Sequence, residues 1–197
     1  MSKLVVAIVG SYRKGGTVDT AVDAVLAGAR EHGAETNKIY LIDQHIEYCR
    51  NCRSCTQTDS PVRGACAIHD DLQAVLSEVH RADAIVLGTP VNFYNATAVF
   101  RTFLERLLGA TYWPWGQWSP KPRSKQLHRK AVLIASSAAP GLLMPIATGA
   151  PKALAIAAGC LGAHPVAKLW IGLAGQSAEV EVSGRVLRKA RKIGQGL

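Results

Sequence analysis

The chain has 197 residues, 48% of them hydrophobic and 19% charged, with a formal net charge of +9. This composition is typical of one globular domain that buries a core without disulfide or metal support. The N-terminal apolar run is too short for a signal-peptide core, and prolines break the apolar region at 131–163. We therefore expect a single cytoplasmic domain over residues 1–197 with no membrane partner.

Apolar strands are predicted over residues 3–9, 35–41, 84–88, 131–136 and 166–173. Helical patterns lie between and after them, at residues 17–32, 70–79, 100–108, 154–161 and 182–193. Asp70 and Asp71 open the second helix and are expected to cap it. Fully apolar strands alternating with amphipathic helices predict a doubly wound α/β sheet, whose ligands bind outside the carboxyl ends of the strands.

The excess positive charge lies mainly at residues 121–130 and 185–192. In the second stretch the basic residues fall opposite the apolar face of the predicted C-terminal helix. A solvated helix face explains this pattern, so we expect no nucleic-acid partner. A basic surface also attracts phosphate-bearing cofactors and anionic substrates.

Three predicted strand ends carry small, polar or aromatic residues. Residues 10–17 read Gly-Ser-Tyr-Arg-Lys-Gly-Gly-Thr, which suits a phosphate at a helix N-terminus. Their glycine spacing departs from the dinucleotide and nucleoside-triphosphate motifs, so a monophosphate fits better. Residues 88–95 place Pro90 before Asn92 and two aromatic residues, as a wall against a flat ring would require. The small residues of 136–141 allow a planar ligand to approach the backbone.

Together, four motifs resemble the NADPH-dependent FMN reductase family, and more narrowly its iron–sulfur flavoprotein branch. They are residues 10–17, the Cys-x2-Cys-x2-Cys run at 49–55, the Asp70-Asp71 pair and Gly-Thr-Pro-Val at 88–91. The resemblance implies a flavodoxin-like five-stranded parallel sheet, in the order 2-1-3-4-5 with helices on both faces, and bound FMN. It also implies a homodimer or homotetramer.

On this resemblance, FMN would contact residues from all three loops. The phosphate would lie on Ser11, Arg13, Gly16, Thr17 and the amide of Val18, and the ring against Pro90, Val91, Asn92, Phe93 and Tyr94. Ser136, Ser137 and Gly141 would complete the site. Two departures are Thr17-Val18, where relatives often have Asn-Thr, and Asn92, where an aromatic residue is frequent.

The implied activity is transfer of hydride from NAD(P)H to flavin, and onward to a flavin, quinone or other small acceptor. The alternative is an iron–sulfur flavoprotein that carries electrons between protein partners. Because the cofactor supplies the redox chemistry, no side chain is predicted to be catalytic. The histidines are scattered, and Ser11, Ser136 and Ser137 lack the sequence context of a hydrolase nucleophile.

Four of the five cysteines, Cys49, Cys52, Cys55 and Cys66, occur within a loop expected at residues 45–69. Their spacing is compatible with a [4Fe–4S] cluster, although ten residues separate the last pair. Zinc is an alternative, as are metal-free thiols made reactive by nearby arginines. The sequence leaves these three interpretations open.

A Trp- and Pro-rich insertion is expected at residues 109–130 and contains three of the four tryptophans. It is interpreted either as a loop packed on the core or a neighbouring subunit, or as an aromatic lid beside the flavin.

Overall fold

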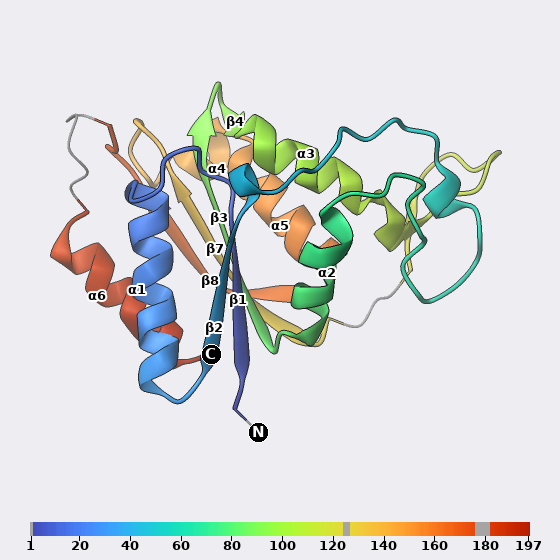
Figure 1. Cartoon of the computed structure of the whole chain (residues 1–197). Helices are drawn as coiled ribbons and strands as arrows, with labels where there is room; N and C mark the ends of the chain where they lie inside the picture. Colours follow the sequence, from blue (N-terminus) through green and yellow to red (C-terminus); the bar gives the residue numbers. More distant parts are fainter. Residues whose placement is uncertain (1, 124–126, 176–181) are drawn as a thin grey trace.

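Figure 1 shows the computed structural model, which describes residues 2–123, 127–175 and 182–197. Its central sheet contains the parallel strands β1 (Leu4–Val9), β2 (Glu35–Tyr40), β3 (Ala84–Asn92), β7 (Arg129–Ser136) and β8 (Ala163–Ile171). Their order is β2-β1-β3-β7-β8, so the predicted 2-1-3-4-5 sheet is confirmed.

Helices cover both faces of this sheet. The helices α1 (Thr17–Glu31) and α6 (Gly184–Gln195) lie on one face, and α2 (Leu72–Arg81), α3 (Ala98–Arg106) and α5 (Ala150–Cys160) on the other (Figure 1). Alternate side chains of a strand point to opposite faces. Val5 and Ala7 accordingly belong to the core under α1 and α6, whereas Val6 and Ile8 belong to the other core.

The remaining elements are short. They are the 3-10 turns η1 (Leu41–Asp43), η2 (Ser54–Thr56) and η3 (Leu107–Ala110), the strands β4 (Asn95–Ala96), β5 (Thr111–Tyr112) and β6 (Lys121–Pro122), and helix α4 (Met144–Ala147). Part of the predicted insertion, residues 124–126, lies outside the described residues. Among the helices described, none combines the length and apolarity needed to cross a membrane.

The third strand departs most from expectation. It was predicted to end at Gly88, but β3 continues through Pro90 to Asn92. Pro90 pairs in register with Ser136 of β7, and the strand then folds back as an antiparallel hairpin with β4. Proline is tolerated near the end of a strand, where a missing N–H interrupts few ladder hydrogen bonds. The aromatic loop is therefore a hairpin turn instead of an open loop.

Candidate functional site

The three sequence-predicted loops meet at one edge of the sheet. They follow β1, β3 and β7, which are neighbours, and their carboxyl ends point the same way (Figure 1). The Gly10 amide donates to the Gly88 carbonyl over 2.7 Å, which links the first two loops. Ligands of doubly wound sheets bind outside the carboxyl ends of the strands; we call this part of the structure the flavin edge.

The first loop leaves the N-terminus of α1 available to an anion. Gly16 occupies the N-cap position, and no side chain caps the helix there. The first amides of a helix have no intrahelical partner, so those of Thr17 and Val18 can bind phosphate. Ser11 is buried, and its hydroxyl accepts from the Arg13 amide over 3.1 Å, which closes a tight turn. The Val18 side chain points inward against Gly88, so only its backbone can contact a ligand.

Behind this loop lies a buried carboxylate that sequence reasoning missed. Asp19 Oδ2 accepts from the Gly15 amide over 2.6 Å and from the Tyr40 hydroxyl over 3.0 Å. Lys38 Nζ lies 3.0 Å from Asp19 Oδ1 and also pairs with Asp23. Burial alone would lower the pKa of Lys38, but hydrogen bonds with Asp23, Tyr40 and Asp19 raise it above its ordinary value. Lys38 thus stays charged and offsets the Asp19 carboxylate behind the phosphate loop.

The second loop presents two aromatic side chains on a tight turn. Phe93 and Tyr94 have φ values of 45° and 62° and both are strongly exposed. Two consecutive positive φ values define a type I′ hairpin turn, a conformation that glycine and asparagine adopt more easily. The Gly149 amide donates to the Tyr94 carbonyl over 2.7 Å, which fixes the turn to the start of α5. The turn therefore holds aromatic surface at the flavin edge in a strained but supported backbone.

The third loop is closed by its own backbone. Ser136 and Ser137 are buried, and the Ser137 hydroxyl donates to the Ala139 carbonyl over 2.9 Å. A Cβ on Gly141 would lie 2.6 Å from the Trp170 carbonyl oxygen, so glycine is required there for packing on β8. Gly141 thus has a structural reason to be small, independent of any ligand.

Thr97 is a buried residue of this edge that the sequence analysis did not identify. Its hydroxyl donates to the Gly10 carbonyl over 2.5 Å and accepts from the Phe100 amide as the N-cap of α3. A threonine just before an apolar helical pattern is an N-cap signal that could have located it.

The cysteine-rich loop leaves the flavin edge and lies on the flank of the molecule, beyond the C-terminal end of α3 (Figure 1). Because it follows β2, the loop starts at the same edge of the sheet as the flavin loops, but it does not stay there. Instead, the Gly64 amide donates to the Gly109 carbonyl over 2.9 Å, and Cys55 contacts Arg123. The loop is therefore paired with the Trp-rich insertion, which packs on the cysteines' own loop.

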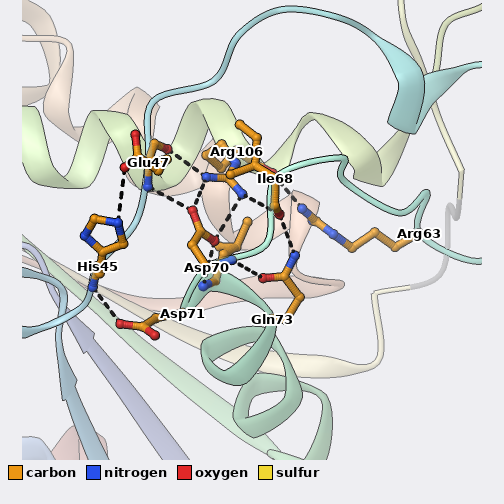
Figure 2. Close-up of polar contacts among 9 residues, drawn as sticks. His45, Glu47, Arg63, Ile68, Asp70, Asp71, Gln73 and Arg106 are labelled. Atoms are coloured by element: carbon orange, nitrogen blue, oxygen red, sulfur yellow. Dashed lines mark hydrogen bonds and ion pairs between the residues drawn. The ribbon is translucent and has the colours of Figure 1, made fainter.

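A buried ion pair holds the base of this loop (Figure 2). Arg106 Nη1 lies 2.5 Å from Asp70 Oδ2, and both side chains are fully buried. Arg106 also donates to the Glu47 carbonyl over 2.7 Å, while Asp70 accepts from the Leu72 amide. The predicted capping role is thus only partly correct, because Asp71 accepts from the His45 amide instead of capping α2.

Two arginines hold the rest of the loop to the insertion. The Arg53 guanidinium lies between the rings of Trp113 and Trp115, 3.8 and 4.2 Å from their centroids, and donates to the Trp113 carbonyl. Arg123 donates to backbone carbonyls on both segments, those of Cys55, Thr58, Ser60 and Gly109. These contacts hold the loop to the insertion.

The four loop cysteines form no disulfide and differ in environment. Burial raises the pKa of Cys55, and the nearby Cys66 thiol adds to this effect. A hydrogen bond with Ser54 lowers the pKa of the exposed Cys52. In the parts of the chain that the structure describes, no three Cys, His, Asp or Glu side chains converge as metal ligands do.

The surroundings nevertheless suit a negatively charged sulfur centre. Arg63 and Arg106 lie within electrostatic reach of Cys66. Arg63 Nη1 and Arg106 Nε are buried without a hydrogen-bond partner. Unsatisfied buried N–H groups are unfavourable unless an acceptor is supplied, and thiolates or cluster sulfides are such acceptors. The N–H donors of Arg63 and Arg106 thus fit a cluster. The four thiols, as described, are not arranged around a common centre.

The sequence model of "NADPH-dependent FMN reductase" matches residues 4–174. The chain belongs to this family. Among curated relatives, an "Iron-sulfur flavoprotein" of Archaeoglobus fulgidus is 34% identical over 103 residues, which cover 52% of this chain and 44% of that protein. One of the same description from Methanosarcina thermophila is 29% identical over 99 residues, 50% of this chain and 49% of that protein. The chain therefore spans about half the length of the curated relatives it matches.

Solved structures of low identity share the fold. A NAD(P)H:quinone oxidoreductase from Methanothermobacter marburgensis superposes with a TM-score of 0.73 at 16% identity, covering 99% of this chain and 98% of that one. An azoreductase from Bacillus anthracis superposes with a TM-score of 0.69 at 18% identity, with full coverage of both chains. A flavodoxin from the domain Archaea gives 0.54 at 13% identity over 98% of this chain and 94% of that one, in accord with the predicted flavodoxin-like fold.

Proposed function

We propose that this member of the FMN reductase family binds FMN at the flavin edge and oxidises NAD(P)H, passing the electrons to a small acceptor such as a quinone or free flavin. The observation that carries the proposal is the convergence of three loops around an uncapped helix N-terminus, all within the matched residues 4–174. When bound, FMN supplies the hydride chemistry.

The chain's own residues would bind and orient the cofactor. The amides of Thr17 and Val18, with the Thr17 hydroxyl and Arg13, would hold the phosphate, because the helix N-terminus favours negative charge. Residues 90–94, which form the end of β3 and the turn after it, would support the ring. Ser136, Ser137 and Gly141 shape the opposite wall through backbone groups, since the Ser137 hydroxyl is already bonded within its loop.

Anaerobic titration of the purified holoprotein tests this function. We expect flavin absorbance that NADPH or NADH bleaches, and a Thr17→Val variant that binds FMN about ten-fold more weakly through loss of one hydroxyl contact. Thr102→Val on α3 is the matched control. Failure of the protein to bind FMN at all would contradict the proposal.

The iron–sulfur carrier remains the second candidate because of the cysteine loop. Cys49, Cys52, Cys55 and Cys66 would hold the cluster, with Arg63 and Arg106 balancing its charge. Iron and acid-labile sulfide in anaerobically purified protein, lost in Cys55→Ser but not in Cys160→Ser, would support it. Protein that contains flavin but no iron, and whose flavin NAD(P)H reduces within turnover time, would exclude the carrier and support the reductase.

Assembly as a homodimer or homotetramer is proposed on the same family resemblance and is testable by light scattering.

A further inference from the structure

A cavity of about 700 Å³ lies away from the flavin edge. Its walls come from α2, α5, the start of β7, the residues that precede β7 and β8, the insertion residues Ala110, Thr111, Pro122 and Arg123, and the segment Pro61–Arg63 of the cysteine loop. In Figure 1 these elements lie toward the amino ends of β3, β7 and β8, whereas the flavin loops follow their carboxyl ends. Its volume is within the range of pockets that enclose small organic ligands.

Most of the lining is apolar. Leu76 and Val79 of α2 face the cavity, as do Ile156 and Leu161 at the end of α5. Ile156 is half exposed, although a large aliphatic side chain is more favourable when covered. This surface favours a ligand with an apolar body.

The charged groups around the cavity are all basic. Arg63, Arg123 and Arg129 line it, and no aspartate or glutamate is among the described residues of the lining. Arg123 and Arg129 donate to backbone carbonyls, which fix their orientation without neutralising their charge. Within the described part of the chain, no carboxylate forms an ion pair with any of the three arginines.

One of these arginines has unused hydrogen-bonding capacity. Arg63 Nη2 donates to the Arg106 carbonyl over 2.6 Å, but its Nη1 is buried with no partner. Because that atom is shielded from solvent, a ligand in the cavity would be selected by the positive charge of the three arginines, which favours an anionic head group over a neutral one.

We propose that this cavity is a second binding site, distinct from the flavin edge, for a small monocarboxylate with an aliphatic or aromatic body. The carboxylate would lie at the Arg63 side, and the body against the helices α2 and α5. The proposal does not depend on flavin or on a nicotinamide donor, although Arg63 borders both this cavity and the cysteine loop.

Fluorescent probe binding to the full FMN-saturated protein tests the site. The anionic probe 1-anilinonaphthalene-8-sulfonate should bind saturably, and decanoate should displace it. Decanamide, which has the same chain but no charge, should compete about ten-fold more weakly, because it lacks the negative charge that the three arginines attract. Equal competition by the two compounds, or probe binding that does not saturate, would overturn the proposal.

Two variants locate the site. A Cβ at Gly159 would meet no atom within 4 Å, so Gly159→Phe should fill the cavity without disturbing α5. Ile156→Glu should repel the anion, whereas Ala155→Glu is a matched control on the same helix that does not line the cavity. We expect the first two variants to lose decanoate-sensitive fluorescence while flavin content and thermal unfolding stay at wild-type values. Wild-type displacement in both would contradict this location.

Discussion

Thr97 joins two parts of the flavin edge through one buried hydroxyl group. It holds the Gly10 carbonyl, caps α3 at Phe100 and lies 3.3 Å from the Thr89 hydroxyl. The phosphate loop is thus fixed to α3, not only to the neighbouring strand. This link matters because a loop that binds an anion through its amides must be held in position before the anion arrives.

Thr97→Val keeps the shape of the side chain and removes its hydroxyl. Since the helix cap and the bond to Gly10 are lost together, we expect a destabilisation of about 1–3 kcal/mol and weaker FMN binding. Denaturant unfolding and FMN titration measure the two effects. Thr102→Val, on the same helix, should stay within about 0.5 kcal/mol of wild type. Equal behaviour of the two variants would show that the Thr97 hydroxyl is dispensable.

At the scale of elements, the cysteine loop and the Trp-rich insertion fold as partners. Asn51 and Arg53 both have positive φ, at 52° and 57°, so the chain turns sharply on either side of Cys52. For residues other than glycine this conformation is unfavourable and needs support. The stacking of Arg53 between Trp113 and Trp115 supplies that support.

Arg53→Lys should loosen this pairing although it keeps the charge. Lysine has no planar group to fill the space between two rings, nor a fork of donors for the Trp113 carbonyl. We expect a loss of about 1–2 kcal/mol of local stability. Faster proteolysis between residues 49 and 66 and red-shifted tryptophan emission would report it. Arg50→Lys, at an exposed position two residues from the Cys52 turn, should behave as wild type. A similar response in both variants would assign the effect to the loop in general.

The Asp70–Arg106 pair fixes the end of the same loop and carries a pH dependence. Burial alone would raise the pKa of Asp70, but Arg106 and the amides of Glu47 and Leu72 bring it below its ordinary value. A carboxyl group whose pKa is lower in the folded than in the unfolded state stabilises the protein at pH values above the unfolded-state pKa. This stabilisation is lost as the pH falls through the folded-state pKa.

Asp70→Asn should therefore destabilise the protein by about 3 kcal/mol at neutral pH, because it leaves a buried guanidinium unpaired. The difference from wild type should shrink as the pH falls below the ordinary aspartate pKa of about 3.9, where the unfolded state takes up a proton, and should be smallest below the lowered folded-state pKa of Asp70. Urea unfolding at several pH values measures this trend. Asp59→Asn, at an exposed site in the same loop, is the control. A difference that does not change with pH would argue against ionised Asp70 as the cause.

At the scale of the whole molecule, α1 and α6 are in direct backbone contact across one face. A Cβ on Gly28 would lie 2.0 Å from the Arg191 carbonyl oxygen, and one on Gly194 would lie 1.9 Å from that of Val25. The C-terminus is further held by Lys3 and Lys130, which donate to the carbonyls of Leu197 and Gly196. Helix α6 thus covers the core that lies between α1 and the sheet.

The same substitution should have opposite effects at two glycines. Gly28→Ala must displace α6, so we expect a destabilisation of about 2 kcal/mol or more. Gly159→Ala meets open space within a helix and should be neutral or stabilise by up to about 1 kcal/mol. Thermal and urea unfolding of both variants test this. A loss of stability at Gly159 would mean that helix propensity does not govern that position.

The sheet was predictable because each strand is a compact apolar run, and the flavin edge because small residues follow three of those runs. The extension of β3 through Pro90 was not, since it depends on pairing with Ser136, which lies far along the chain. Nor could the sequence place Arg53 between two tryptophans about 60 residues away. No periodic pattern records such a contact. The lateral position of the cysteines follows from these same long-range contacts, so it too required the structure.

The arginine contacts that hold the cysteine loop have a consequence for how its thiols could change during evolution. In small metal-dependent domains, loss of one ligand abolishes folding, so the ligand set cannot drift. Here Arg53, Arg106 and Arg123 shape the loop through rings, a carboxylate and carbonyls. Descendants of such a chain could exchange or abandon thiols one at a time and still inherit an intact scaffold.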